Sequence, residues 1–176
     1  MKKEYGKALR QLFARRMKAD LPQFRETKVK SLYLFPGERA YLWAVSEQLH
    51  CWVVLSPSPK DYDEFTLLIG WSTHGRYPEL SCIPSMQSPA ADRAEFAKDE
   101  YLIRLPMLWT DKGDWWVVRP FKPARSNKDL LAQVAPIAPD EALRQTQPRV
   151  DEAIEQLKSH GIPYLQAFVD ACELNR

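Results

Sequence analysis

The sequence predicts an α+β fold in which an antiparallel sheet carries helices on one face. Three observations predict it: an amphipathic helical pattern at the N-terminus, several runs of strand composition joined by short connections, and helical patterns over the last fifty residues. Helices that precede and follow a set of strands, without alternating with them, are typical of this class. A length of 176 residues fits a single domain over residues 1–176 with one core.

Residues 3–20 are predicted to form the first helix. Apolar side chains recur there at steps of three and four residues, which gives the helix one face to bury. These side chains are Tyr5, Leu9, Leu12, Phe13, Met17 and Leu21. Pro22 disfavours helical conformation at the residue before it, so the helix is expected to end there.

The sheet is expected over residues 30–71 and 115–119. Its predicted strands are Lys30–Phe35, Arg39–Ser46, His50–Ser56, Glu64–Trp71 and Trp115–Arg119. The connections among the first four are short, whereas parallel neighbours need a crossover of a dozen or more residues, so we expect an antiparallel meander of about five strands. His50–Ser56 and Trp115–Arg119 are apolar on both faces, which predicts either central positions for them or cover on both sides of the sheet.

Residues 72–91 are expected to be irregular, because prolines at positions 78, 84 and 89 interrupt any regular element. The spacing of apolar residues in Asp92–Ile103 then predicts a short helix.

The C-terminal helices are predicted over residues 128–174. Ser126 or Asn127 can cap a helix over 128–134, and Pro139 suits the first position of the next helix. Pro148 either kinks that helix or opens a new one. Gly161 is expected to end it, with the last helix over Tyr164–Cys172. We expect the helices to pack on the sheet.

Cysteine usage and the N-terminus indicate a cytoplasmic protein. Cys51, Cys82 and Cys172 are odd in number and widely spaced, which argues against a disulfide framework and a zinc ribbon. The first residues contain no uninterrupted apolar run typical of a secretory signal, and no segment is apolar enough to span a bilayer. We therefore expect no membrane association.

Positive charge is concentrated at the N-terminus. The net charge is +2, but residues 1–30 hold ten basic and three acidic side chains, so that the first segment carries +7 and the remainder −5. A basic helix can contact phosphates, yet a solvated helix face that balances its own domain is the simpler interpretation. The small net charge makes nucleic acid an unlikely partner.

Known catalytic signatures are absent from the sequence: it contains no G-x-S-x-G, Walker, G-x-G-x-x-G or H-E-x-x-H motif. His50 and Cys51 are adjacent in a predicted strand and so point to opposite faces, which prevents the imidazole from activating the thiol. Asp61, Asp63 and Glu64 lack the glycine turn and the distal glutamate of a calcium loop and are interpreted as solvated carboxylates. We predict neither a metal nor a cofactor.

Tryptophan is the unusual feature of the composition, with six residues in the chain. Its large ring and single donor suit it to anchoring a partner, although packing in the core is the simpler interpretation of each. A polar stretch containing a histidine and an arginine also leaves the strand that ends at Trp71. The candidate binding residues are Trp71, His74, Arg76, Trp109, Trp115 and Trp116.

Several segments resemble those of small bacterial proteins grouped as a domain-of-unknown-function family. They are the run DEFTLLIGWS from Asp63 to Ser72, its continuation Gly75-Arg76-Tyr77-Pro78, Arg104-Leu105-Pro106 through Leu108-Trp109, Asp114-Trp115-Trp116, and Gly161-Ile162-Pro163-Tyr164. The resemblance implies a bacterial origin and a helix-flanked antiparallel sheet. It implies no activity, and no functional residue is carried over from it.

Together these observations favour a non-catalytic binding or interaction module, with an immunity-type protein that masks another protein as one form. The first alternative is a small enzyme or ligand-binding protein for a small molecule, with a polar pocket near His74 and Arg76 and with Asp111 or Asp114 assisting. It requires these groups to converge on one reacting atom. The second alternative is a weak binder of single-stranded nucleic acid that uses the basic helix and exposed rings.

Overall fold

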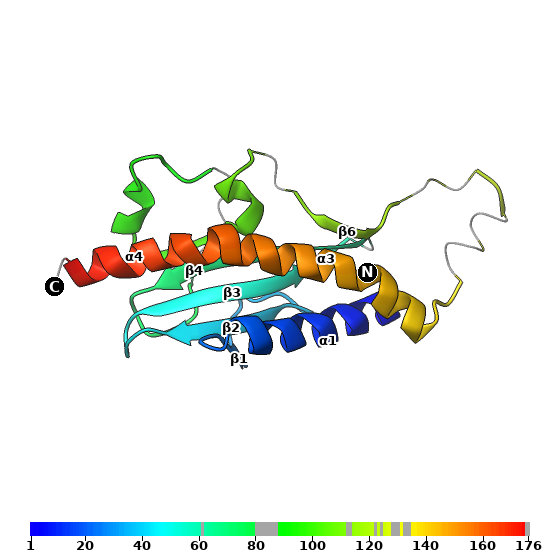
Figure 1. Ribbon diagram of the computed structural model, residues 1–176, viewed down its shortest axis with the longest axis horizontal. Coiled ribbons are helices and arrows are strands. Elements are labelled where there is room, and N and C mark those ends of the chain that lie inside the picture. The colour runs from blue at the N-terminus through cyan, green and yellow to red at the C-terminus, as the bar shows by residue number, and fades with distance from the viewer. Residues whose placement is uncertain are drawn as a thin grey trace.

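The structure is a two-layer arrangement of helices on an antiparallel sheet (Figure 1). It is a computed structural model that describes residues 1–60, 62–79, 88–111, 114–121, 123, 125–127, 131 and 135–174. The predicted α+β class is confirmed. None of the described helices combines the length and the apolar character needed to cross a membrane.

The sheet has six strands, all paired antiparallel. They are β1 (Arg25–Thr27), β2 (Arg39–Ala44), β3 (His50–Pro57), β4 (Asp63–Ser72), β5 (Glu100–Arg104) and β6 (Trp116–Arg119). The first five follow one another in space as in the chain, so the predicted meander is confirmed. β5 and β6 share one edge of β4, β5 pairing with Leu68–Ser72 and β6 with Asp63–Phe65.

The helical layer consists of α1 (Lys3–Asp20), α3 (Pro139–Gln156) and α4 (Ile162–Leu174). A single π-helical turn, Leu157–Gly161, joins α3 to α4 in one continuous run (Figure 1). Arg16 on α1 binds Asp151 and Glu155 on α3, so α1 and α3 are held together by charge as well as by packing. Two short 3₁₀ helices, Ala94–Ala97 and Leu105–Leu108, flank β5.

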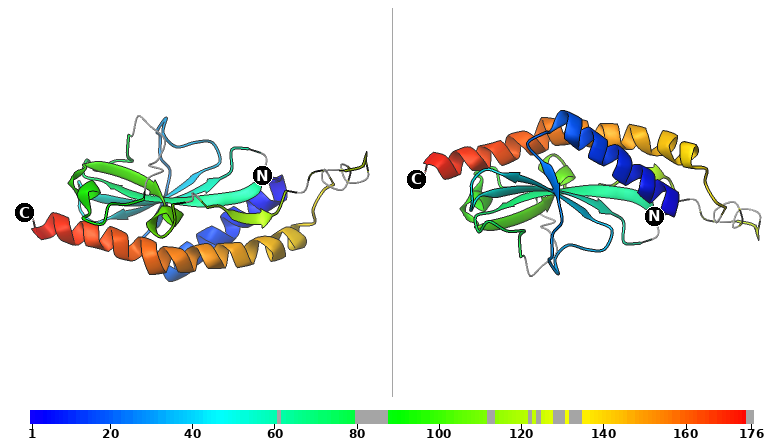
Figure 2. Two further views of the ribbon diagram at one scale, coloured as in Figure 1. Left: turned by 90° about the horizontal axis from the view of Figure 1, so that it is seen from above. Right: turned by 90° about the horizontal axis from the view of Figure 1, so that it is seen from below.

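Each face of the sheet carries its own apolar core. Alternation along the strands sends Val53 and Trp71 toward the helices, where Leu9, Phe13 and Phe168 are packed in the larger core. The opposite face, which we call the second face, carries a smaller core of Ala40, Trp52, Val54, Leu68, Tyr77 and Leu102. In Figure 2 the segment between β1 and β2 projects from this face, on the side of the sheet away from the helices.

Two strand predictions and one helix prediction need correction. Lys30–Phe35 is not a strand, since the chain there leaves the sheet, and the first strand is the polar segment Arg25–Thr27. Asp92–Ile103 is not mainly helical: only Ala94–Ala97 forms a 3₁₀ turn, and Glu100–Arg104 is β5. β6 is not central, because in the described part of the chain it pairs with β4 alone.

The C-terminal helices agree with the sequence in part. Pro139 is the first residue of α3, as predicted, and Pro148 lies inside this helix. Gly161 does not end the helix, because the π turn carries the chain on into α4. A π turn widens the helix, which suits Pro163, whose nitrogen has no hydrogen to donate. Of the helix predicted over 128–134, all residues but Leu131 lie outside the described residues, as does Cys82.

Candidate binding site

A pocket of about 280 Å³ opens on the second face, between the chain that follows β1 and the chain that follows β4. β3 supplies its inner wall, because His50 and Trp52 alternate with the helix-facing Cys51. The side chains used in the argument below are Lys28, Lys30, His50, Trp52, Arg76, Tyr77 and Glu79.

The wall that follows β4 is held in place by glycine and tryptophan. Gly75 adopts a φ of +65°, and its N–H donates to the Gln48 carbonyl at 2.7 Å. A Cβ on Gly75 would lie 2.5 Å from the Glu47 oxygen, so only glycine fits this approach. The Trp52 Nε1 then donates to the Arg76 carbonyl at 3.1 Å, which brings Tyr77 over the second face.

Trp52 also organises the rings of the pocket. The ring centroids of Trp52 and Tyr77 lie 5.2 Å apart in an edge-to-face arrangement, and those of Trp52 and His50 lie 6.1 Å apart in the same arrangement. Edge-to-face pairs of this kind add to the stability gained by burial, so three rings from two segments form one rigid wall.

Two polar atoms in this wall have no hydrogen-bond partner. They are Nδ1 of His50 and the hydroxyl of Tyr77, and both are buried. Burial lowers the pKa of His50 and raises that of Tyr77, so both side chains are neutral at pH 7. A buried polar group without a partner costs about 1–3 kcal/mol, which a bound molecule could recover.

The charge around the pocket is mainly positive. Lys28, Lys30 and Arg76 line it against one carboxylate, that of Glu79. Arg76 is already engaged: it lies 2.5 Å from the Glu79 carboxylate and 3.3 Å from that of Glu100. Lys28 and Lys30 form no ion pair with any described residue, so they are available to an anion.

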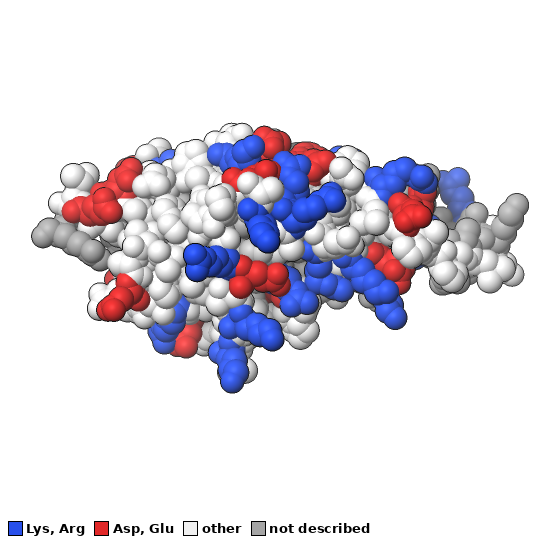
Figure 3. Space-filling view, turned by 60° about the horizontal axis from the view of Figure 1, so that its bottom comes forward, with Lys and Arg blue, Asp and Glu red and all other residues white. Residues whose placement is uncertain are grey.

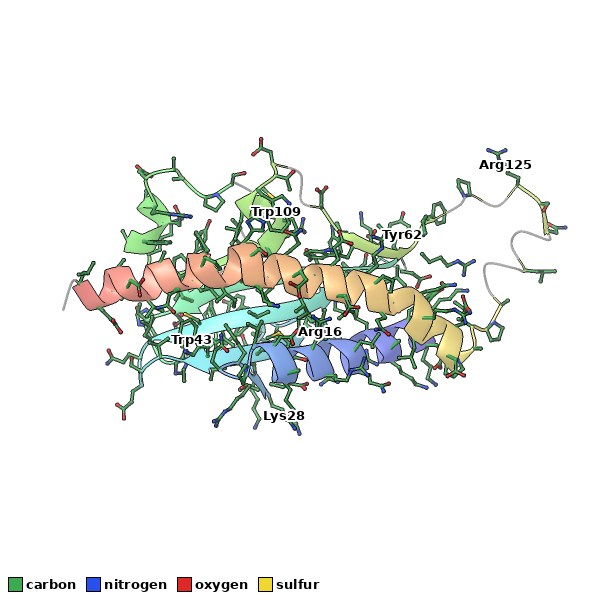
Figure 4. All side chains as sticks on the ribbon, viewed as in Figure 1. Arg16, Lys28, Trp43, Tyr62, Trp109 and Arg125 are labelled. Carbon is green, nitrogen blue, oxygen red and sulfur yellow. The ribbon has the colours of Figure 1, made fainter. Side chains whose placement is uncertain are left out.

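Next to the pocket, residues 28–38 form a segment that we call the arm. Its apolar side chains divide between two directions: Val29 and Leu34 pack on the smaller core, whereas Leu32, Tyr33 and Phe35 are 95%, 40% and 60% exposed. Lys28, at the base of the arm, extends away from the body of the protein (Figure 4).

A carboxylate fixes the far end of the arm. Glu38 accepts hydrogen bonds from the Phe35 N–H at 2.8 Å and from the Ser56 hydroxyl on β3 at 2.6 Å. The Glu38 N–H donates in turn to the Phe35 carbonyl at 3.1 Å. Burial raises the pKa of Glu38, and these two donors oppose that shift. The exposed apolar side chains therefore lie on a braced turn.

The structure separates the predicted pair His74 and Arg76. Arg76 lines the pocket, but His74 is exposed outside it, and its N–H donates to the Ser72 hydroxyl at 3.2 Å. Asp111 and Asp114, the predicted assistants, are exposed, and Asp111 accepts from the Ser88 hydroxyl at 2.7 Å. These groups do not converge on one atom.

Two of the predicted tryptophans are core residues. Trp71 is fully buried, its ring stacks on Phe168 at 3.9 Å between centroids, and its Nε1 donates to the Lys98 carbonyl at 2.9 Å. Trp116 is 7% exposed and stacks on Phe65 at 5.6 Å. Both rings are buried by neighbouring side chains, so neither offers a surface to a partner.

The other two tryptophans lie apart from the pocket. Trp109 is 42% exposed, with its ring 4.8 Å from that of His160 in the π turn of the helical layer (Figure 4). Trp115 is partly exposed beneath the guanidinium of Arg104, 5.3 Å away. Of the six predicted residues, only Arg76 contributes to the pocket.

His50, Trp52, Tyr77 and the two lysines of the arm were not among the predicted binding residues. Alternation could have found the first two: the reasoning that sends His50 and Cys51 to opposite faces also places His50 beside Trp52. No local sequence pattern predicts that Tyr77 lines the pocket, because its position depends on the turn at Gly75.

A larger cavity, of about 1200 Å³, lies near the start of α1 and the end of β6. Its charges balance, with Lys2, Lys3 and Arg119 against Glu4, Asp63 and Glu141. Pro120 and Phe121, which follow β6, and Ala135, Pro136 and Ile137, which precede α3, also line it.

Metal and thiol chemistry find no support in the described part of the chain. No group of three or more His, Cys, Asp or Glu side chains there could hold a metal ion. Cys51 is buried on the helix side of β3, and burial raises the pKa of its thiol to about 12. Comparison with protein-family models, curated proteins and solved structures finds no match for the chain.

Proposed function

We propose that this chain is a non-catalytic binding module that docks on a partner protein through the arm. The observation that carries the proposal is the exposure of three large apolar side chains, Leu32, Tyr33 and Phe35, within one short braced segment. Contiguous exposed apolar groups on a soluble surface mark interaction sites. Masking of a partner, as by an immunity-type protein in a bacterial cytoplasm, would use a surface of this kind.

The charges on the arm indicate the chemistry of the partner. Lys28 and Lys30 lie at its base without an ion pair among the described residues, and Glu38 is turned inward onto Ser56. The arm therefore presents apolar side chains beside positive charge. A partner that fits it has an apolar patch bordered by Asp or Glu, because complementary charge steers association and excludes wrong partners.

The two alternatives have less support. An enzyme needs its reacting groups to converge, and His74 and Arg76 are separated. For nucleic acid, the face that Figure 3 shows carries acidic side chains among the basic ones. Within α1, Lys7 pairs with Glu4, and Arg16 is neutralised by α3. A continuous basic surface, which phosphate binding requires, is lacking there.

The test compares variants of the tagged full-length chain in affinity capture from its native lysate, at low and high salt, with mass spectrometry. We expect one stoichiometric protein with an acidic surface, captured by the wild type and by the control Leu174→Ser, which removes an equally exposed apolar side chain elsewhere. The double variant Leu32→Ser, Phe35→Ser should lose it. Equal capture by the wild type and the arm variant would overturn the proposal.

A second copy of the chain is the competing occupant. Light scattering after gel filtration measures the oligomeric state of the wild type and of the arm variant. A wild-type monomer is expected. A wild-type dimer that the double variant converts to monomer would show that the arm docks on itself, and would overturn the assignment of a separate acidic partner.

A further inference from the structure

We propose that the pocket beside the arm binds a small organic anion, a carboxylate or a phosphate monoester carried on a flat ring. This site differs from the docking surface, because its inner wall is built on β3 and on the chain after β4 and the exposed apolar side chains of the arm do not line it, but Lys28 and Lys30 belong to both. Three independent features support it: unpartnered buried polar atoms, an excess of cations and an aromatic wall.

The unpartnered atoms are concentrated on one face. Among the described residues four buried side-chain atoms lack a hydrogen-bond partner, in His50, Thr66, Tyr77 and Thr146. The first three belong to the second face, since Thr66 alternates with the helix-facing Phe65 and Leu67. His50 and Tyr77 line the pocket, and Tyr77 is 95% buried. Native proteins satisfy nearly all such groups, so the two that line the pocket, in His50 and Tyr77, point to a missing polar molecule, whereas Thr66 lies outside the pocket.

The cations fix the sign of that molecule. Glu79 and Glu100 exceed the charge of Arg76 by one, and Lys28 and Lys30 at the mouth add two positive charges without an ion pair among the described residues, so these five groups sum to a net positive charge. The neutral Tyr77 hydroxyl is a donor, and the imidazole becomes a second donor at Nδ1 when it carries that hydrogen. Donors with positive charge around them recognise an oxyanion, and charge-assisted bonds of this type are the stronger ones.

The shape limits the size of the molecule. A volume of about 280 Å³ falls just below the range of roughly 300–1,000 Å³ that is usual for ligand pockets, so one ring with one acidic group fills it. The partly exposed side chains of Val29, Leu42 and His50, which line the pocket, supply the surface against which such a ring packs.

The experiment titrates the full-length protein with phenyl phosphate, with benzoate and with uncharged benzyl alcohol by calorimetry, and follows the ring signals of His50 by NMR. We expect at least one of the two anions to bind at a single site and to shift His50, and the alcohol not to bind. Which anion binds distinguishes phosphate from carboxylate.

Variants locate the binding. Lys28→Ala with Lys30→Ala should weaken it about tenfold or more, the loss typical of removing charged donors. Lys18→Ala, which removes an exposed lysine of α1, should leave it unchanged. Equal binding of the alcohol, binding of neither anion, an unmoved His50 signal or an unaffected lysine variant would each overturn the site. The double variant Leu32→Ser, Phe35→Ser should still bind the anion, so failure of protein docking and failure of this site are distinguishable.

Discussion

Replacing Tyr77 with Phe should stabilise the unliganded protein. The ring of Tyr77 packs edge-to-face on Trp52 at 5.2 Å and is 95% buried, and phenylalanine keeps both of these contacts. Only the hydroxyl is removed, and in this structure it has no partner. A buried hydroxyl without a hydrogen bond costs about 1–3 kcal/mol, so we expect the free energy of unfolding to rise by about 1–2 kcal/mol.

Urea titration followed by tryptophan fluorescence measures this change, and a thermal scan should show a melting point higher by about 2–8 °C. Thr146→Val is the matched control, because its hydroxyl is also buried without a partner but lies in α3, away from the pocket. It should stabilise the protein by about 1 kcal/mol. If the phenylalanine variant were less stable than the wild type, the Tyr77 hydroxyl would have a partner, and the argument from unsatisfied atoms would be refuted.

Three further predictions follow from packing and charge. Gly70→Ala should lower the free energy of unfolding, measured by urea titration, by more than about 4 kcal/mol, because its Cβ would lie 1.9 Å from the Tyr101 carbonyl oxygen. Gly6→Ala is the control: its Cβ would meet nothing closer than 3.4 Å, so it should raise the stability of α1 by about 0.5–1 kcal/mol. Equal changes in the free energy of unfolding for the two variants would contradict the prediction. Arg16→Gln should cost about 1 kcal/mol, less at high salt, and a cost that salt does not change would exclude charge as its origin. Cys51 should resist alkylation by iodoacetamide at pH 8 in the native state and react in urea, as peptide mass spectrometry can show. Burial raises the pKa of its thiol from 9.0 to about 12, so the folded state loses stability as the pH rises above about 9. Rapid alkylation of the native protein would disprove the burial of Cys51.

The sequence predicted those elements whose side chains report directly on burial. The repeat of Leu9 and Phe13 predicts α1, alternation predicts β2, and the continuous apolar composition of β3 and β4 predicts these two strands, because each element buries its apolar side chains. β1 was missed because its three residues are polar and carry no apolar pattern. It is a strand because its backbone pairs with β2. Part of the arm was predicted as a strand because Leu32, Tyr33 and Phe35 are residue types common in strands. Composition alone does not show whether such side chains are buried in a sheet, and here they are exposed.

The site was less predictable than the fold, for a different reason. Arg76 was found because a polar stretch leaves a strand, but its partners Glu79 and Glu100 and the neighbouring arm reach it only through tertiary contacts. Trp71 and Trp116 were predicted as binding residues but are buried. The sequence around a tryptophan in a strand does not show whether other elements will cover its ring. The turn at Gly75, with its close approach to Glu47, decides these contacts and is visible only in three dimensions.

The ion pairs between α1 and α3 have a consequence for how the chain folds while it is made. α1 is synthesised before α3, which begins at Pro139. Until α3 has left the ribosome, Leu9 and Phe13 on the apolar face of α1 lack the cover that α3 gives them in the larger core. The larger core is therefore completed only after α3 has been made, and until then the apolar face of α1 is open to chaperones.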